Sequence, residues 1–214
     1  MTAAPVPVRG GPTLLQDALV TIVTRFGLAV LIFSTDIVLA HLLGPDAKGR
    51  FTLVLLFSQL AALVVGWGMD SALGVVAGRD RESARAGFAN AVIWSAVVGG
   101  FAVIISGWLY GLPTEVRPRG PLVALIPNLS AAQFTYAALA IPGELFFSVG
   151  LFALLGRRRI ASYSAIRVLR RLMLLVGIVG VAVIYKLSLD IALVINVATL
   201  VLTAVAIWWA ARQD

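Results

Sequence analysis

Long apolar runs recur along the whole chain, and they limit the fold more than any other feature of the sequence. A helix needs about 20 mostly apolar residues to cross the hydrocarbon core of a bilayer. Runs of this kind predict about six spans, namely Leu14–Leu43, Phe51–Ala77, Phe88–Tyr110, Ala131–Leu155, Val168–Tyr185 and Leu189–Ala211. The sequence therefore predicts an all-α fold, a polytopic transmembrane helix bundle of about six spans.

The composition agrees with a membrane environment. Hydrophobic residues make up 60% of the chain and charged residues only 13%, whereas a soluble domain averages about 45–50% and about 25%. A soluble fold of this size could not hide so much apolar surface. The fourth apolar run begins at Leu122, but prolines interrupt it, so we expect Leu122–Asn128 to lie at the membrane interface and the span to begin near Ala131.

The chain divides into a short leader and one membrane domain. Residues 1–12 are rich in proline and glycine and predict a flexible cytoplasmic leader, and residues 13–214 form the six-helix lobe. Because the connections are short, consecutive helices should be antiparallel neighbours. The expected loops are Gly44–Arg50, Gly78–Gly87, Gly111–Pro121, Gly156–Arg167 and Lys186–Ser188. The first span carries Asp17, Arg25 and Asp36 and lacks a small-residue cleavage site at its end, so it is not a removable signal peptide.

Positive charge predicts the orientation in the membrane. The N-terminal leader, the second loop, the segment around Arg157–Arg171 and the C-terminus hold most of the lysines and arginines. Loops of this kind stay in the cytoplasm, so both termini should be cytoplasmic and the number of spans even. The net charge of +7 follows these loops, and we expect Arg157–Arg171 to lie against anionic lipid headgroups rather than nucleic acid.

Catalytic and metal-binding motifs are absent from the sequence. It contains no cysteine, one histidine, and no phosphate-binding, dinucleotide-binding, HExxH or GxSxG motif. We therefore expect no enzyme activity, no cofactor and no metal. A multi-pass protein without such a site is typical of a transporter.

Four ionisable residues inside predicted spans are the candidates for a functional role. They are Arg25, Asp36, Asp70 and Glu144. A charge at the bilayer centre costs about 2.5–3.5 kcal/mol on insertion scales, so such groups face a cavity or a partner. Arg25 and Asp36 are eleven residues apart, about three helical turns, and therefore share one face of the first helix about 16 Å apart.

These four residues suggest a transport site. Arg25 offers a cation to an anionic substrate, Asp70 could line the same cavity, and Asp36 and Glu144 could bind a proton or cation for coupling. Glu144 follows Pro142, which frees a backbone carbonyl in the middle of the span. Two interpretations remain open for each carboxylate, because a structural ion pair, including one between Asp70 and Arg25, would also satisfy its charge.

Small residues at helical spacing predict close helix packing. Gly74 and Gly78 form one GxxxG pattern and Gly107 and Gly111 another, while Gly177 and Gly180 lie about one turn apart. In lipid, such positions let two helix backbones approach each other.

The segment around the first predicted loop resembles a known family. Residues Val38–Phe51 read VLAHLLGPDAKGRF, and Gly66–Ala72 read GWGMDSA. Together with Ile141-Pro142, Gly156 and the basic loop that follows, these resemble the Wzx-like polysaccharide flippases of the multidrug/oligosaccharidyl-lipid/polysaccharide exporter superfamily. The resemblance covers essentially the whole chain in span order. Relatives are roughly twice as long, so it corresponds to their N-terminal six-helix lobe alone, and His41 stands where they usually have an arginine.

The resemblance implies a bacterial cytoplasmic-membrane transporter that flips a polyprenyl-diphosphate-linked oligosaccharide by alternating access. Arg25 matches a position that is often basic in these flippases and is the expected diphosphate contact. One lobe gives half a cavity, so a second six-helix lobe, from a second copy or another chain, is the expected partner alongside membrane lipids. Two alternatives remain open: a proton- or cation-coupled exporter of another substrate, and a non-transporting scaffold of a polysaccharide assembly complex.

Overall fold

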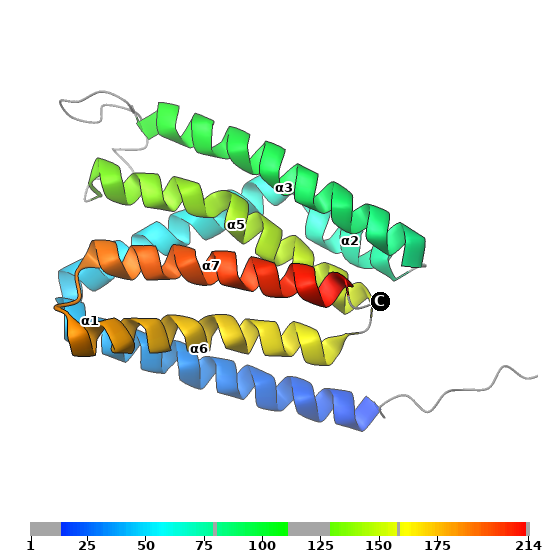
Figure 1. Ribbon diagram of the computed structural model, residues 1–214, viewed down its shortest axis with the longest axis horizontal. Coiled ribbons are helices and arrows are strands. Elements are labelled where there is room, and N and C mark those ends of the chain that lie inside the picture. Colours follow the sequence, from blue (N-terminus) through cyan, green and yellow to red (C-terminus); the bar gives the residue numbers. More distant parts are fainter. Residues whose placement is uncertain (1–13, 79–80, 111–128, 158, 213–214) are drawn as a thin grey trace, which may run out of the picture.

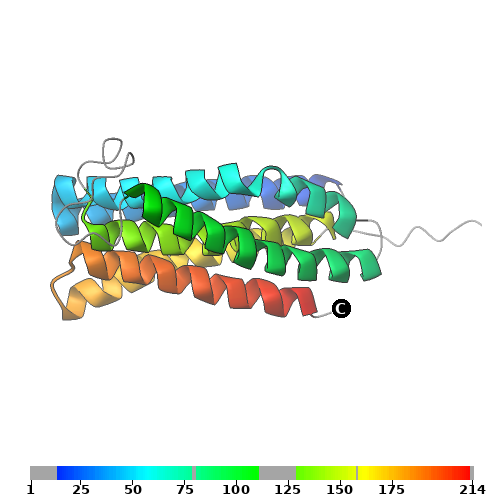
Figure 2. The same ribbon diagram turned by 90° about the horizontal axis from the view of Figure 1, so that it is seen from above.

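The protein is an elongated bundle of helices. The computed structural model describes residues 14–78, 81–110, 129–157 and 159–212, and every regular element within these ranges is helical. The helices are α1 (Leu14–Gly66), α2 (Met69–Ala77), α3 (Arg81–Tyr110), α5 (Ala131–Gly156), α6 (Ile160–Ile184) and α7 (Leu189–Arg212). The start of α1 and the end of α7 lie at the same end of the bundle (Figures 1 and 2). The predicted leader, residues 1–12, lies outside the described residues.

Helix α1 consists of two helices that double back at Gly44. Gly44 has φ 80° and ψ 168°, while the residues on both sides are helical. The Nζ atom of Lys48 lies 3.7 Å from Oδ1 of Asp36, although twelve residues of straight helix would separate them by about 18 Å. The chain therefore reverses here, and the second half of α1 runs back along the bundle in the opposite direction to the first half (Figure 1).

The loop predicted over Gly44–Arg50 is wrong, because the helix resumes directly after Gly44. Pro45 sits in the first turn, where its fixed φ favours the helix and its missing N–H costs nothing. Asp46 also lies in that first turn, where a carboxylate complements the helix dipole. Arg50 donates from Nη2 to Oδ2 of Asp46 at 2.8 Å, one turn later.

Helix α1 ends where the backbone turns left-handed. Trp67 has φ 35° and Gly68 has φ 78°, and α2 begins immediately afterwards at Met69. The predicted second span, Phe51–Ala77, is therefore interrupted near its end. The loops predicted over Gly78–Gly87 and Gly156–Arg167 are also mostly helical, since α3 begins at Arg81 and α6 at Ile160. The predicted loop Gly111–Pro121 and the interfacial segment Leu122–Asn128 lie outside the described residues.

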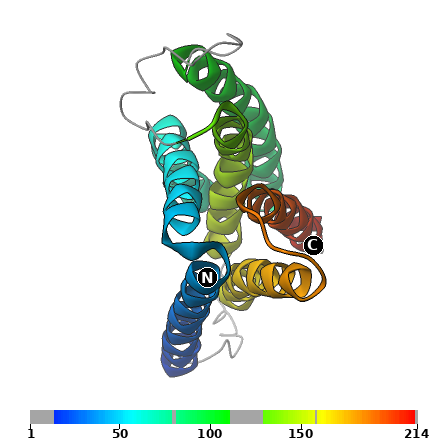
Figure 3. The same cartoon turned by 90° about the vertical axis from the view of Figure 1, so that its left-hand side faces the viewer.

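Helix α5 forms the centre of the bundle. It contacts each of the other five described helices, and the end-on view places it between the second half of α1 on one side and α3 and α7 on the other (Figure 3). A capping box fixes its start, with the Ser130 hydroxyl accepting from the Gln133 N–H and the Gln133 side chain accepting from the Ser130 N–H. The helix continues through Pro142 to Gly156, which confirms the predicted span.

Glycines bring α2 against the end of α5. A Cβ atom on Gly156 would lie 2.1 Å from the backbone oxygen of Gly74, and one on Gly78 would lie 3.2 Å from the oxygen of Gly156. The predicted packing role of Gly74 and Gly78 is therefore confirmed. Gly107 and Gly180 have open space around them, whereas Gly177 packs against Ile195.

Within the described ranges, four helical segments are long and apolar enough to cross a membrane, which indicates a multi-pass membrane protein. They are Thr21–Gly66, which includes the reversal at Gly44, and Ala86–Tyr110, Ala131–Gly156 and Leu189–Ala211. Helix α6 differs, because every stretch of membrane-spanning length within it contains Arg167, Arg170 and Arg171. These three arginines line a cavity inside the bundle.

Candidate functional site: an arginine-lined cavity

A cavity of about 400 Å³ lies between both halves of α1, the middle of α5 and the first half of α6. Most of its wall is apolar. The polar and charged side chains that line it are Gln59, Glu144, Ser148, Tyr163, Arg167, Arg170 and Arg171. Three arginines face one carboxylate, so the described wall of the cavity carries an excess of positive charge.

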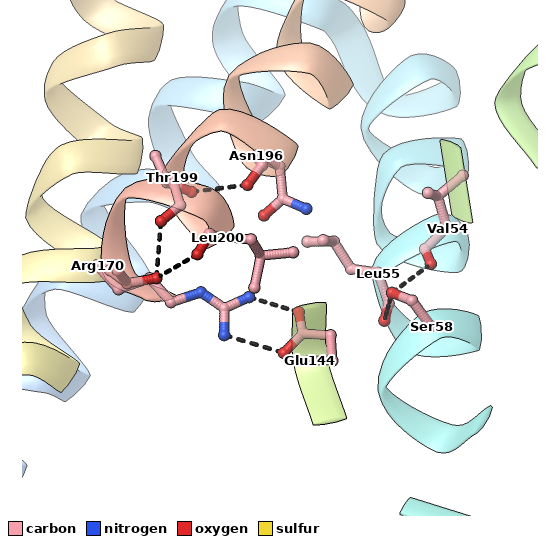
Figure 4. A network of polar contacts seen from close by, with 9 residues as sticks. Val54, Leu55, Ser58, Glu144, Arg170, Asn196, Thr199 and Leu200 are labelled. Carbon is pink, nitrogen blue, oxygen red and sulfur yellow. Dashed lines mark hydrogen bonds and ion pairs between the residues drawn. The ribbon is translucent and has the colours of Figure 1, made fainter. Parts of the chain in front are cut away.

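Glu144 and Arg170 form a two-fold ion pair inside this cavity. Arg170 donates from Nη1 to Oε2 of Glu144 at 2.9 Å and from Nη2 to Oε1, so the two planar groups face each other (Figure 4). Both side chains are buried, at 11% and 7% exposure. The guanidinium also lies 4.4 Å from the centre of the Phe147 ring, a cation–π contact.

The other two arginines are not neutralised in this way. Arg167 donates from Nη1 to the Tyr163 hydroxyl at 3.1 Å and lies 5.4 Å from the centre of that ring. Arg171 is half-buried and makes no hydrogen bond or ion pair with any described residue. A guanidinium has five N–H donors, so Arg171 leaves its donors available to a ligand in the cavity.

The bundle is closed on one side of the cavity. Leu174, about one turn after Arg170 and Arg171, is buried in a hydrophobic core at the end of the bundle that contains Gly44. The core also includes a second residue of α6 and residues from α1 and from in or just before the first two turns of α5 and α7: Leu39, Phe51, Val54, Leu129, Ala137, Ile178, Leu187, Ala192 and Leu193. The lining residues Gly66, Phe152 and Tyr163 extend the cavity towards the opposite end, where α1 begins and α7 ends.

Of the predicted site residues whose side chains the structure describes, Glu144 alone lines this cavity. Arg25 is exposed and pairs with no described residue, although Leu28 and Ile32, one and two turns further along α1, line the cavity. Asp36 is 51% exposed and pairs with Lys48 at the Gly44 end. The side chain of Asp70 lies outside the described part of the structure, so its predicted pairing with Arg25 stays a prediction.

The sequence interpretation missed Arg167, Arg170 and Arg171, because it treated Arg157–Arg171 as one basic surface segment. A helical pattern was available as a signal. These residues stand at i, i+3 and i+4, so they share one face of α6. The buried Leu174 and Ile178 continue that face towards the core.

The first part of the same basic segment binds the end of α7. Arg159 donates from Nη1 to the backbone oxygen of Ala210 at 2.8 Å, and Arg157 donates from Nη1 to that of Ala211 at 3.2 Å. The last carbonyls of a helix lack partners within it and carry its negative dipole end. These arginines therefore cap α7, where we expected contacts to lipid headgroups.

Comparison with known proteins finds no matching family model, curated protein or solved structure. The flippase resemblance stays a prediction from the sequence.

Proposed function

We propose that this chain is a six-helix transporter lobe that flips a polyprenyl-diphosphate-linked oligosaccharide across the cytoplasmic membrane for surface polysaccharide synthesis, by alternating access. The observation that carries the proposal is the arginine-lined cavity. Guanidinium groups suit a diphosphate, because they donate pairs of N–H bonds to phosphate oxygens. Arg167 and Arg171 offer such donors, and the apolar remainder of the wall suits a lipid-linked molecule.

The charge of the cavity also supports an anionic over a cationic substrate. Counting all spans by sequence gives more carboxylates than arginines, which favours a cation exporter. Counting the described residues that line the cavity reverses this balance. The one carboxylate among them, Glu144, is already paired with Arg170.

In this proposal the membrane is crossed six times, twice by α1 and its extension α2 and once each by α3, α5, α6 and α7. Helix α6 has 25 residues, about 37 Å of helix, which is long enough to span a bilayer. Its three arginines line the cavity with α1 and α5, so they need not face lipid. The Lys/Arg distribution then places the start of α1 and the end of α7 in the cytoplasm.

The test is transport by the purified protein in liposomes that contain a fluorescent undecaprenyl-diphosphate sugar. A membrane-impermeant reductant that bleaches the outer leaflet reports how fast the probe crosses. We expect transport by the wild type and a loss of roughly tenfold or more in Arg171→Gln, because a free guanidinium is removed from the cavity. The mass of the same sample should correspond to two lobes.

Arg25→Gln is the matched control, since it removes the same charge from outside the cavity lining. Transport that survives Arg171→Gln but not Arg25→Gln would move the substrate path to the outer face of α1. A protein with no transport at all would overturn the proposal and leave the scaffold alternative.

A further inference from the structure

We infer that Glu144 is a built-in competitor of the substrate anion for Arg170, so that this carboxylate sets how tightly the cavity binds a diphosphate. The inference rests on the proposed function, because it concerns the affinity of the same cavity. In this role Glu144 does not bind the substrate. Its carboxylate occupies the place on Arg170 that a phosphate would take.

The geometry of the Glu144–Arg170 pair supports competition between the carboxylate and a phosphate. A guanidinium binds a carboxylate and a phosphate through the same two parallel N–H bonds. Glu144 already takes both Nη atoms of Arg170. A phosphate in the cavity can therefore bind Arg170 strongly only where Glu144 releases it, whereas Arg171 is available without any exchange.

The location of the Glu144–Arg170 pair lets its charges act on a ligand in the cavity. Both side chains line the cavity with Arg167 and Arg171, so their charges act on a ligand across a short distance and in poor contact with water. The four side chains together carry a formal charge of about two positive units, which matches a diphosphate. Without Glu144 the cavity would be more positive and Arg170 would be free.

The test measures binding of undecaprenyl diphosphate to the purified protein in nanodiscs, with undecaprenol as a neutral lipid of the same chain. In Glu144→Gln, which keeps the shape and a hydrogen-bond acceptor, we expect undecaprenyl diphosphate to bind roughly tenfold more tightly. In Arg170→Gln, which leaves Glu144 unpaired, we expect binding to weaken by a similar factor. Undecaprenol should bind equally to all of them.

The double variant Glu144→Gln/Arg170→Gln distinguishes competition from a merely structural pair. It restores the wild-type charge of the cavity, so diphosphate affinity should return to within about threefold of the wild type. Asp190→Asn is the charge-matched control, because Asp190 is exposed in the first turn of α7, and it should leave affinity unchanged. Thermal unfolding of each variant checks that it is folded.

The outcomes separate the two proposals. A wild type that prefers the diphosphate over undecaprenol, with Glu144→Gln equal or weaker, would overturn the competitor role and leave the proposed function standing. A double variant that stays as weak as Arg170→Gln would do the same. A wild type without any preference for the diphosphate would overturn the proposed function and this inference with it.

Discussion

Helix α5 and the first half of α1 contain similar side chains in opposite surroundings. Each has a carboxylate well inside a predicted span, Glu144 and Asp36. Glu144 is buried against a guanidinium that holds both of its oxygens. Asp36 is half exposed and meets Lys48 at 3.7 Å, beyond hydrogen-bond distance.

The two helices also differ in how much of their surface other helices cover. Helix α5 contacts every other described helix, while on the first half of α1 even Val23 and Phe26 are exposed by 68% and 73%. The comparison shows that a charge in a span gains a partner from the position of its helix in the bundle. Residue type and depth alone do not decide it.

The largest effect should come from removing the interior charge. In Glu144→Ala, Arg170 loses the partner for its buried guanidinium, and breaking a buried pair costs about 3–5 kcal/mol. We expect the free energy of unfolding, measured by denaturant titration in mixed micelles, to fall by that amount. The double variant Glu144→Ala/Arg170→Leu should recover part of the loss. A loss below about 1 kcal/mol would show that α5 gains nothing from its central position.

An effect of intermediate size should separate two glycines, one on α5 and one on α1. Gly156→Ala on α5 would bring a Cβ atom to 2.1 Å from the Gly74 oxygen, so α2 must move away, at a cost of about 1–3 kcal/mol. Gly27→Ala on α1 has no neighbouring atom within 4 Å and should stabilise the helix by about 0.5–1 kcal/mol. Thermal unfolding in one detergent compares both, and equal shifts would contradict the packing described here.

The smallest effect should come from the pair at the Gly44 end. Asp36→Asn removes an exposed ion pair, which contributes less than about 1 kcal/mol and is screened by salt. Lys48→Met should give the same small loss, and the difference from wild type should shrink between low and high salt. A loss as large as that of Glu144→Ala would mean that Asp36 is covered by another protein surface in the membrane.

The sequence predicted those helices that are bounded by clear changes in composition. The expected spans Ala131–Leu155 and Leu189–Ala211 correspond to α5 and α7 within one residue at each end, because an apolar run stops where polar residues begin. The start of α6 was placed too late. Arginines stand just before its first residue and again from Arg167 onward, so the region was interpreted as a basic loop. Arg157 and Arg159 instead bind α7, and Arg167, Arg170 and Arg171 line the cavity.

The candidate site was predictable only in part. Periodicity shows that Arg167, Arg170 and Arg171 share a helix face, but it does not say what that face meets. Arg170 and Glu144 are 26 residues apart, and the pairing depends on how α6 packs beside α5. The sequence therefore identified Glu144 as an unusual charge and missed the arginine that neutralises it.

The arginine caps on α7 have a mechanical consequence. Arg157 ends α5 and Arg159 begins α6, and both bind the last carbonyls of α7, so charge-assisted hydrogen bonds join three helix ends at one point. Sliding α7 along its axis, or pulling the α5–α6 turn away from it, would break both bonds at once. We therefore expect the ends of α5, α6 and α7 to move together, and the bundle to bend at Gly44 and Gly68, where φ is positive.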